Sequence, residues 1–162
     1  GSEMCIRDSL TRLHHKEVSP SIQPVWVEKP VQFMLNDRIV WTGQLDLADE
    51  MGRIRDTKTT SRRPKPEQYL INMTGYSCGA RQLSGEVEAD VVLDYLVNTK
   101  TPYYLPVSAG GPVTDDSIRR FVSIAEGVAE TIEAGNYPAN GVQNGACSWC
   151  GYRSMCDYAL KE

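Results

Sequence analysis

The residues best suited to chemistry are two carboxylates and a lysine within the stretch WTGQLDLADEMGRIRDTK. Residues 39–49 alternate with the period of a β-strand, which places Asp46 on the polar face of that strand. A tight turn follows, and residues 53–60 form a second alternating run that sets Asp56 and Lys58 on a common side. If the two strands pair through the turn, both carboxylates and the ammonium group gather at one place.

Two neighbouring carboxylates can share a hard divalent cation, which prefers oxygen ligands and tolerates bound water. Mg²⁺ or Mn²⁺ held by Asp46, Asp56 and the backbone carbonyl of Thr57 would polarise a phosphodiester oxygen and activate a water molecule as the nucleophile. Lys58 would stabilise negative charge that develops at the phosphorus, or would orient that water.

The order Gly-x-x-Asp, nine residues, Asp-x-Lys resembles the PD-(D/E)XK nuclease superfamily, and within it the RecB-like branch with its CRISPR-associated exonucleases and phage relatives. That branch also carries a tyrosine-bearing helix after the lysine and a C-terminal cysteine cluster, and both patterns are present here. The resemblance implies an α/β, restriction-endonuclease-like core with a central mixed sheet flanked by helices. It also implies a Mg²⁺- or Mn²⁺-dependent exonuclease acting on single-stranded DNA ends in recombination, repair or CRISPR-type processing.

The tyrosine-bearing helix is expected to start near Pro66, a residue suited to a first helical turn. Gln68, Asn72 and Tyr76 follow at four-residue spacing and would share one helix face. In the resembling family this face is catalytic and usually has a glutamine four residues before the tyrosine, where this chain has Asn72. The alternative is ordinary helix surface with a core tyrosine.

A basic cluster lies between the lysine and this helix, at Arg62, Arg63 and Lys65. Its position beside the carboxylates favours contacts with backbone phosphates of DNA. A solvated surface loop explains the same residues about equally well.

Three cysteines, Cys147, Cys150 and Cys156, form a C-x2-C-x5-C pattern near the end of the chain. Clustered thiols without a secretion signal indicate a metal site in a reducing compartment more than disulfides. In the resembling branch such triads join a distant cysteine to hold a [4Fe–4S] cluster, and Cys5 and Cys78 are the candidates here for the fourth ligand. Zinc competes for thiolate ligands, incomplete occupancy is expected if the natural N-terminus is missing, and free thiols in a small appendage are a further alternative.

The remaining elements complete the sheet. Residues 25–35 are expected to form a strand pair or a bulged strand, with Pro30 marking an edge or a break. Glu28 within them resembles a glutamate that RecB-like nucleases often carry ahead of the Gly-x-x-Asp motif, although a solvated carboxylate fits equally well. Two more strands are expected at 89–97 and 103–108. A helix capped by Thr114 should run to Gly135, because its apolar residues recur at one helical face.

The 162 residues suffice for one core, and 41% hydrophobic with 23% charged residues is ordinary for a globular protein. The expected division is 1–24 as a tail or cloning-derived segment, 25–138 as the nuclease core, and 139–162 as a cysteine-rich module. No segment has the length and hydropathy of a membrane span, and no signal peptide is evident. We therefore expect a cytoplasmic protein of a bacterial, archaeal or phage-infected cell.

The net charge of −4 argues against a protein that coats nucleic acid nonspecifically. Metal-binding carboxylates count as negative in that sum, so a nuclease is not excluded. Two rival functions stay open: a catalytically silent DNA-binding or structural fragment of a larger helicase-nuclease, and a protein whose only metal lies at the cysteines.

Overall fold

The computed structural model describes residues 2–62, 64–136 and 146–156. The chain forms two compact units, residues 1–125 and 126–162. In chain order the elements are α1 (Ser2–Leu13), the π-helical turn η1 (His14–Val18), η2 (Ser19–Ser21), β1 (Pro24–Met34), β2 (Val40–Asp49), β3 (Arg53–Thr60), η3 (Pro66–Gln68), α2 (Leu70–Ser84), β4 (Asp90–Val97), β5 (Tyr103–Ser108), α3 (Asp115–Glu133), η4 (Ala146–Ser148) and η5 (Arg153–Met155).

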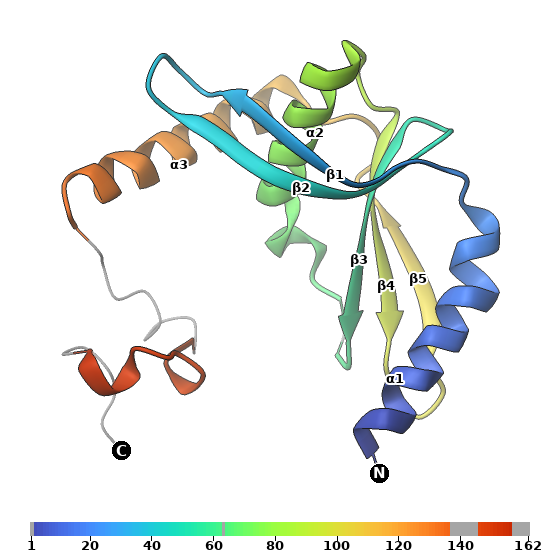
Figure 1. The fold of residues 1–162 in the computed structure, drawn as a ribbon. Helices are drawn as coiled ribbons and strands as arrows, with labels where there is room; N and C mark the ends of the chain where they lie inside the picture. The colour runs from blue at the N-terminus through green and yellow to red at the C-terminus, as the bar shows by residue number, and fades with distance from the viewer. Residues whose placement is uncertain (1, 63, 137–145, 157–162) are drawn as a thin grey trace. The chain divides into compact units, whose positions relative to one another are not determined.

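The five strands form one sheet in the order β1-β2-β3-β4-β5 (Figure 1). β3 and β4 are parallel, and the other three neighbouring pairs are antiparallel. The predicted mixed sheet flanked by helices is therefore confirmed. β1, which carries Pro24 and Pro30, is an edge strand, where a residue without a backbone N–H costs no ladder hydrogen bond.

Both faces of the sheet are covered, which β4 shows most directly because nearly all of its residues are buried. Leu93 and Tyr95 belong to the main core, together with Met73 and Ala80 of α2. Leu96, on the opposite face, packs in a second cluster with residues from the N-terminal segment. In Figure 1, α2 lies against the β1–β2 hairpin and α1 lies on the side of β5.

Glycines let α2 approach the β1–β2 hairpin closely. A Cβ atom on Gly75 would lie 2.6 Å from the Trp41 ring, and one on Gly79 would lie 2.7 Å from Val31. Real Cβ atoms do not come so near to other heavy atoms, so no larger residue fits here without displacement of the helix. This close contact positions the residues of α2 over β2.

The alternation of buried and exposed side chains along β2 is interrupted near Asp46. Leu45 and Ala48 both join the core under α2, although they are three residues apart instead of two. On β1 the neighbouring register pairs Val27↔Leu47 and Lys29↔Leu45 leave Glu28 unpaired between them, with a positive φ of 48°. A left-handed backbone is rare outside glycine, so it marks a local distortion of the hairpin at this level.

Part of the N-terminal segment packs onto the sheet, although residues 11–24 show no regular apolar period in the sequence. Leu13, Val18 and Ile22 are buried and pack against Leu96 of β4. The π-helical turn η1 explains why the sequence pattern is hidden, because it separates Leu13 from Val18 by five residues instead of three or four. The three-part division of the chain at residues 24 and 138 stays a prediction.

The expected helix capped by Thr114 is α3. The hydroxyl of Thr114 accepts a hydrogen bond from the Ser117 amide at 3.2 Å, and Gly135 follows the helix with a positive φ of 67°. Phe121 is buried, whereas Val128 and Ile132 of the same apolar stripe are more than half exposed.

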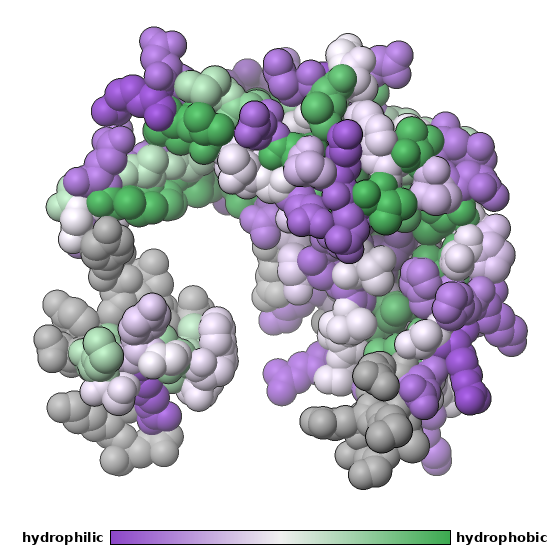
Figure 2. Space-filling view, in the orientation of Figure 1, coloured by the Kyte–Doolittle hydropathy of each residue, from purple (hydrophilic) through white to green (hydrophobic). Residues whose placement is uncertain are grey.

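Figure 2 shows further hydrophobic residues, in green, at the surface over the β1–β2 hairpin, where Met34 and Val40 are exposed. None of the helices in the described ranges is both long and apolar enough to span a bilayer.

Candidate active site

Asp46 and Asp56 meet across the β2–β3 hairpin. The register pairs Leu47↔Arg55 and Ala48↔Ile54, extended by one position, place the two aspartates opposite each other. Asp46 is exposed, and Asp56 is only 4% exposed. Burial raises the pKa of Asp56, the Lys58 ammonium opposes this, and the neighbouring Asp46 carboxylate adds to the rise, so that the pKa lies above its ordinary value.

Lys58 binds Asp56 directly, as their common side of β3 predicts. Its Nζ lies 3.0 Å from Oδ1 and 2.7 Å from Oδ2 of Asp56, and also 5.0 Å from the centre of the Tyr69 ring. Burial lowers the pKa of Lys58, but the hydrogen bond and charge of Asp56 and the charge of Asp46 outweigh it and raise the pKa overall. Lys58 is thus a firmly protonated cation beside two carboxylates.

The residues present fit a divalent cation. Oδ2 of Asp56 is buried, and although Lys58 stands near it, no group in the described ranges hydrogen-bonds to it with ordinary geometry. This oxygen already accepts the Lys58 ammonium as an ion pair at 2.7 Å, so its surroundings favour a positive charge. The described residues contain no group of three or more His, Cys, Asp or Glu side chains that could hold a metal ion. The set available here is smaller: two carboxylates and the Thr57 carbonyl, which water would have to complete.

Tyr76 reaches the same place from α2. Its ring packs edge-on against Trp41 with 5.8 Å between ring centres, and a Cβ on Gly43 would lie 3.1 Å from the Tyr76 ring. The glycine of Gly-x-x-Asp therefore makes room for the tyrosine. Burial raises the pKa of Tyr76, and the charges of Asp56 and Asp46 add to the rise. The phenol is therefore close enough to both carboxylates for their charges to act on it.

The predicted amide face of this helix is divided between two elements. Gln68 belongs to the 3₁₀ turn η3, which is closed by a hydrogen bond from the Tyr69 amide to the Pro66 carbonyl. The α-helix α2 begins only at Leu70. A single face at four-residue spacing therefore holds for Asn72 and Tyr76 only, since a 3₁₀ turn advances 120° per residue instead of 100°. Asn72 is exposed, and the Gln68 side chain lies outside the described part of the structure.

The basic loop follows β3, and two of its three cationic residues lie in the described part of the chain. Arg62 and Lys65 are exposed and line a cavity of about 240 Å³ together with Tyr69 and Tyr95. Arg63 lies outside the described residues. The loop is fastened at its start, where the Thr60 hydroxyl accepts from the Arg62 amide at 3.1 Å.

The cysteines do not form a metal site within the described ranges. Cys147 and Cys156 are half-buried, Cys150 is exposed, and all three are free thiols of the smaller unit. Cys78 lies on α2 in the larger unit, where burial raises the pKa of its thiol. The Cys5 side chain is outside the described part.

Glu28 lies level with Asp46 in the β1–β2 register. Its carboxylate accepts a hydrogen bond of 2.9 Å from the Gln44 side chain. This contact accounts for one of its two carboxylate oxygens.

Sequence reasoning missed a buried ionic network on the opposite face of the sheet. Arg55 bonds Asp94 at 2.8 and 2.6 Å and Asp49 at 3.2 Å, and the Tyr104 hydroxyl donates to Asp94 at 2.6 Å. Its signal in the sequence is Asp94, a carboxylate within the otherwise apolar run VVLDYLV, because a buried charge must have a partner. The network ties β2, β3, β4 and β5 together behind the candidate site.

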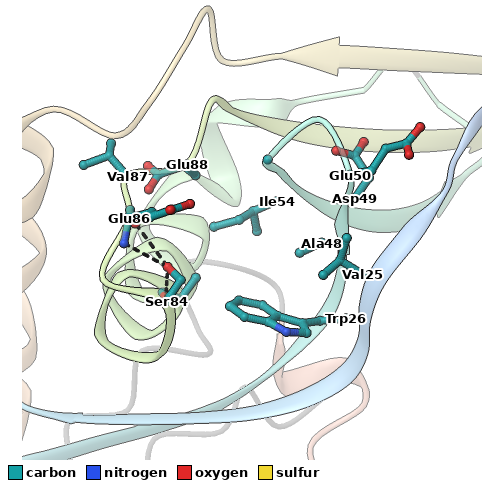
Figure 3. A pocket seen from close by; sticks show the side chains of 12 residues that line it. Val25, Trp26, Ala48, Asp49, Glu50, Ile54, Ser84, Glu86, Val87 and Glu88 are labelled. Carbon is teal, nitrogen blue, oxygen red and sulfur yellow. Dashed lines mark hydrogen bonds between the residues drawn. The ribbon is translucent and has the colours of Figure 1, made fainter.

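A second cavity, also of about 240 Å³, lies beside the turn of the β2–β3 hairpin (Figure 3). Trp26, Ala48 and Ile54 give it an apolar floor, and carboxylates stand around it, as Figure 3 shows for Asp49, Glu50, Glu86 and Glu88. Its acidic character makes it unsuitable for the phosphates of a nucleic acid.

Comparison with known proteins points to one family. Residues 3–157 match the family model of the PD-(D/E)XK nuclease superfamily. A candidate exonuclease from Eubacterium rectale has a similar crystal structure, with a TM-score of 0.62 and 15% identity over 96% of this chain and 60% of that one. The crystal structure of SSO0001 is also similar, with a TM-score of 0.56 and 13% identity over 98% of this chain and 69% of that one. At these identities the two structures show the fold. No curated protein matches the chain.

Proposed function

Because the chain belongs to the PD-(D/E)XK nuclease superfamily, we propose that it is a Mg²⁺- or Mn²⁺-dependent deoxyribonuclease of the RecB-like branch. It removes nucleotides from single-stranded DNA ends in the cytoplasm. The observation that carries the proposal is the meeting of Asp46, Asp56 and Lys58 on adjacent strands. The similarity to a candidate exonuclease supports the mode of action, although this chain spans 60% of that protein.

Asp46, Asp56 and the Thr57 carbonyl would hold the metal ion, which when bound would supply a Lewis acid and an activated water at neutral pH. Burial raises the pKa of Asp56, and the neighbouring Asp46 carboxylate adds to the rise; a bound cation would neutralise the repulsion between the two carboxylates. Lys58, protonated and held beside Asp56, stabilises the negative charge that develops on the phosphate oxygens as the water attacks.

The residues of η3 and α2 position the substrate. Tyr76, Asn72 and Gln68 line the groove beside the carboxylates, and the first two contact the scissile phosphate or the attacking water. Arg62, Arg63 and Lys65 bind backbone phosphates, which fixes the strand without reading its sequence.

The cysteines Cys147, Cys150 and Cys156 are proposed ligands of a [4Fe–4S] cluster that needs a fourth thiolate. Iron and sulfide analysis of anaerobically purified protein, with zinc measured in parallel, decides between iron–sulfur, zinc and free thiols. A stoichiometric cluster that survives Cys5→Ser would show that Cys5 is not the fourth ligand.

The nuclease proposal is tested by cleavage of labelled single-stranded, duplex and circular DNA with Mg²⁺, with Mn²⁺ and with a chelator. We expect metal-dependent release of nucleotides from linear single strands and no cleavage of circles. Binding without cleavage under all metal conditions would instead identify a silent DNA-binding module. Cleavage of circles would identify an endonuclease.

A further inference from the structure

The cavity beside the basic loop shares a wall with the candidate active site. Its lining includes Thr59, Thr60, Arg62, Lys65, Tyr69 and Tyr95. Tyr69 contributes to both the cavity and the candidate active site, because the Lys58 ammonium lies over its ring, 5.0 Å from the ring centre. A ligand group in this cavity would therefore sit next to the group that acts at the scissile phosphate.

Tyr95 is the unexplained residue of this cavity. It pairs with Lys58 in the parallel β3–β4 register, so its side chain is on the face of the sheet that carries Lys58 and Asp56. It is only 2% exposed, and its hydroxyl has no hydrogen-bond partner in the described ranges. A buried hydroxyl without a partner costs free energy that a phenylalanine would avoid. A ligand oxygen in the cavity would supply the missing partner.

The charges around the cavity favour an anion. Arg62 and Lys65 are exposed cations, and both line the cavity. Glu67 of the following turn η3 is a carboxylate whose charge reaches Tyr95, in addition to that of Asp56. The cavity beside the turn of the β2–β3 hairpin, by contrast, is surrounded by carboxylates. A phosphate group matches a guanidinium, an ammonium and hydroxyl donors together.

We propose that this cavity is a phosphate subsite for the substrate strand, in which Tyr95 donates a hydrogen bond to a phosphate oxygen and Arg62 and Lys65 supply positive charge. Tyr95 is thus a binding residue beyond the acid–acid–base set. The inference rests on the proposed nuclease function, because the substrate strand supplies the phosphate. That phosphate is either an internal diester or a terminal monoester, and these two sources are separable by experiment.

The test measures binding without cleavage. Fluorescence anisotropy in EDTA gives the dissociation constants of internally labelled oligo-dT that is linear with a 5′-phosphate, linear with a 5′-hydroxyl, or circular. Tyr95→Phe keeps the ring and removes only the oxygen, and Lys65→Ala removes one cation. We expect Tyr95→Phe to weaken binding roughly tenfold, the effect of losing one hydrogen bond to a charged group.

Two matched variants serve as controls. Lys16→Ala removes an exposed cation of η1, on the other side of the sheet, and should leave binding unchanged. Tyr104→Phe removes a hydroxyl that has partners in Asp94 and Arg55. It should lower the melting temperature without weakening DNA binding, whereas Tyr95→Phe should weaken binding without lowering the melting temperature.

Each pattern has one meaning. Loss confined to the 5′-phosphorylated strand identifies a terminal phosphate, and equal loss on all three substrates identifies an internal one. Unchanged affinity of Tyr95→Phe for every substrate overturns the subsite, even if the wild-type protein cleaves DNA. Conversely, Tyr95-dependent binding by a protein that never cleaves would leave the subsite standing and refute the nuclease.

Discussion

At the scale of single residues, the site carries an electrostatic cost that a metal ion would remove. Burial raises the pKa of Asp56, and repulsion by the Asp46 carboxylate adds to the rise, so that the pKa is above its ordinary value in spite of the Lys58 ion pair. A carboxylate whose pKa is raised in the folded state destabilises the fold once the pH exceeds the pKa that the group has in the unfolded chain. Perturbed pKa values of this kind cluster at functional sites, where like charges are held close together.

Asp46→Asn should therefore stabilise the metal-free protein at pH 7. Removal of the exposed charge relieves the repulsion, by up to about 1 kcal/mol, the order of magnitude for a partly exposed charge pair. The same variant loses an ionic ligand, so the increase in melting temperature that Mn²⁺ gives to the wild-type protein should vanish. Thermal unfolding with Mn²⁺ and with EDTA measures both effects. A variant that is still stabilised by Mn²⁺ would remove Asp46 from the ligand set.

Lys58→Ala should separate metal binding from chemistry. The ammonium competes with a cation for Asp56, so the variant should bind Mn²⁺ at least as firmly as the wild type. Cleavage should fall on the order of a hundredfold or more, as when one preorganised charge-stabilising group is removed. Single-turnover rates at saturating Mn²⁺ give the value. Full activity would assign Lys58 to the ion pair alone.

These residues could be predicted from sequence because strand alternation and one short turn fix their positions. Asp56 and Lys58 are two residues apart on β3, and the hairpin brings Asp46 opposite. Tyr95 could not be found in this way. It is an apolar-looking position in a buried strand, and only the parallel pairing with β3, across an intervening helix, places it beside Lys58.

At the scale of elements, the decisive contact is that of α2 with the β1–β2 hairpin. Gly79→Ala would place a Cβ 2.7 Å from Val31, a β-branched side chain with little freedom to turn away. The expected loss is about 1–3 kcal/mol of unfolding free energy, as for overpacked cores. Chemical denaturation provides the measurement.

Gly127→Ala on α3 is the matched control. A Cβ there meets no atom of the described residues within 4 Å, and the residue is helical. This substitution should stabilise by about 0.5–1 kcal/mol, because alanine is the better helix former. If both substitutions had the same sign, close packing of α2 would not explain the first.

Element boundaries were predictable only where the local signal matched a regular helix or strand. Thr114 and Gly135 bracket α3 as expected. Pro66 instead opens a 3₁₀ turn that delays α2 to Leu70, and the π-helical turn η1 hides the apolar face of the N-terminal segment. Neither departure from the 3.6-residue period is visible in residue types alone.

At the scale of the whole molecule, the two faces of the sheet differ in the polar groups that they carry. The face under α2 carries the candidate site, where the Tyr95 hydroxyl lacks a hydrogen-bond partner among the described residues. The opposite face carries the network of Arg55 with Asp49, Asp94 and Tyr104, in which every charge has a partner. These partners join strands far apart in sequence, which is why no local pattern predicts them.

The stability of the larger unit should therefore depend on the Tyr104 hydroxyl at alkaline pH. Burial, followed by the hydrogen bond to Asp94, raises the pKa of Tyr104 from 10.0 to about 12. Between these values an unfolded chain has released the proton and the native chain still holds it, so the unfolding free energy must fall as the pH rises. The slope from this one residue approaches about 1.4 kcal/mol per pH unit.

Tyr104→Phe isolates this contribution from the other groups that titrate in the same range. The variant should be less stable than the wild type at pH 8, because Asp94 and Arg55 each lose a partner. The difference in unfolding free energy should then shrink between pH 10 and pH 12, since only the wild type loses stability through this hydroxyl. Urea denaturation of both proteins at pH 8, 10, 11 and 12 gives the two curves. Parallel curves would mean that Tyr104 titrates at its ordinary pKa and that its bond to Asp94 does not hold the strands together.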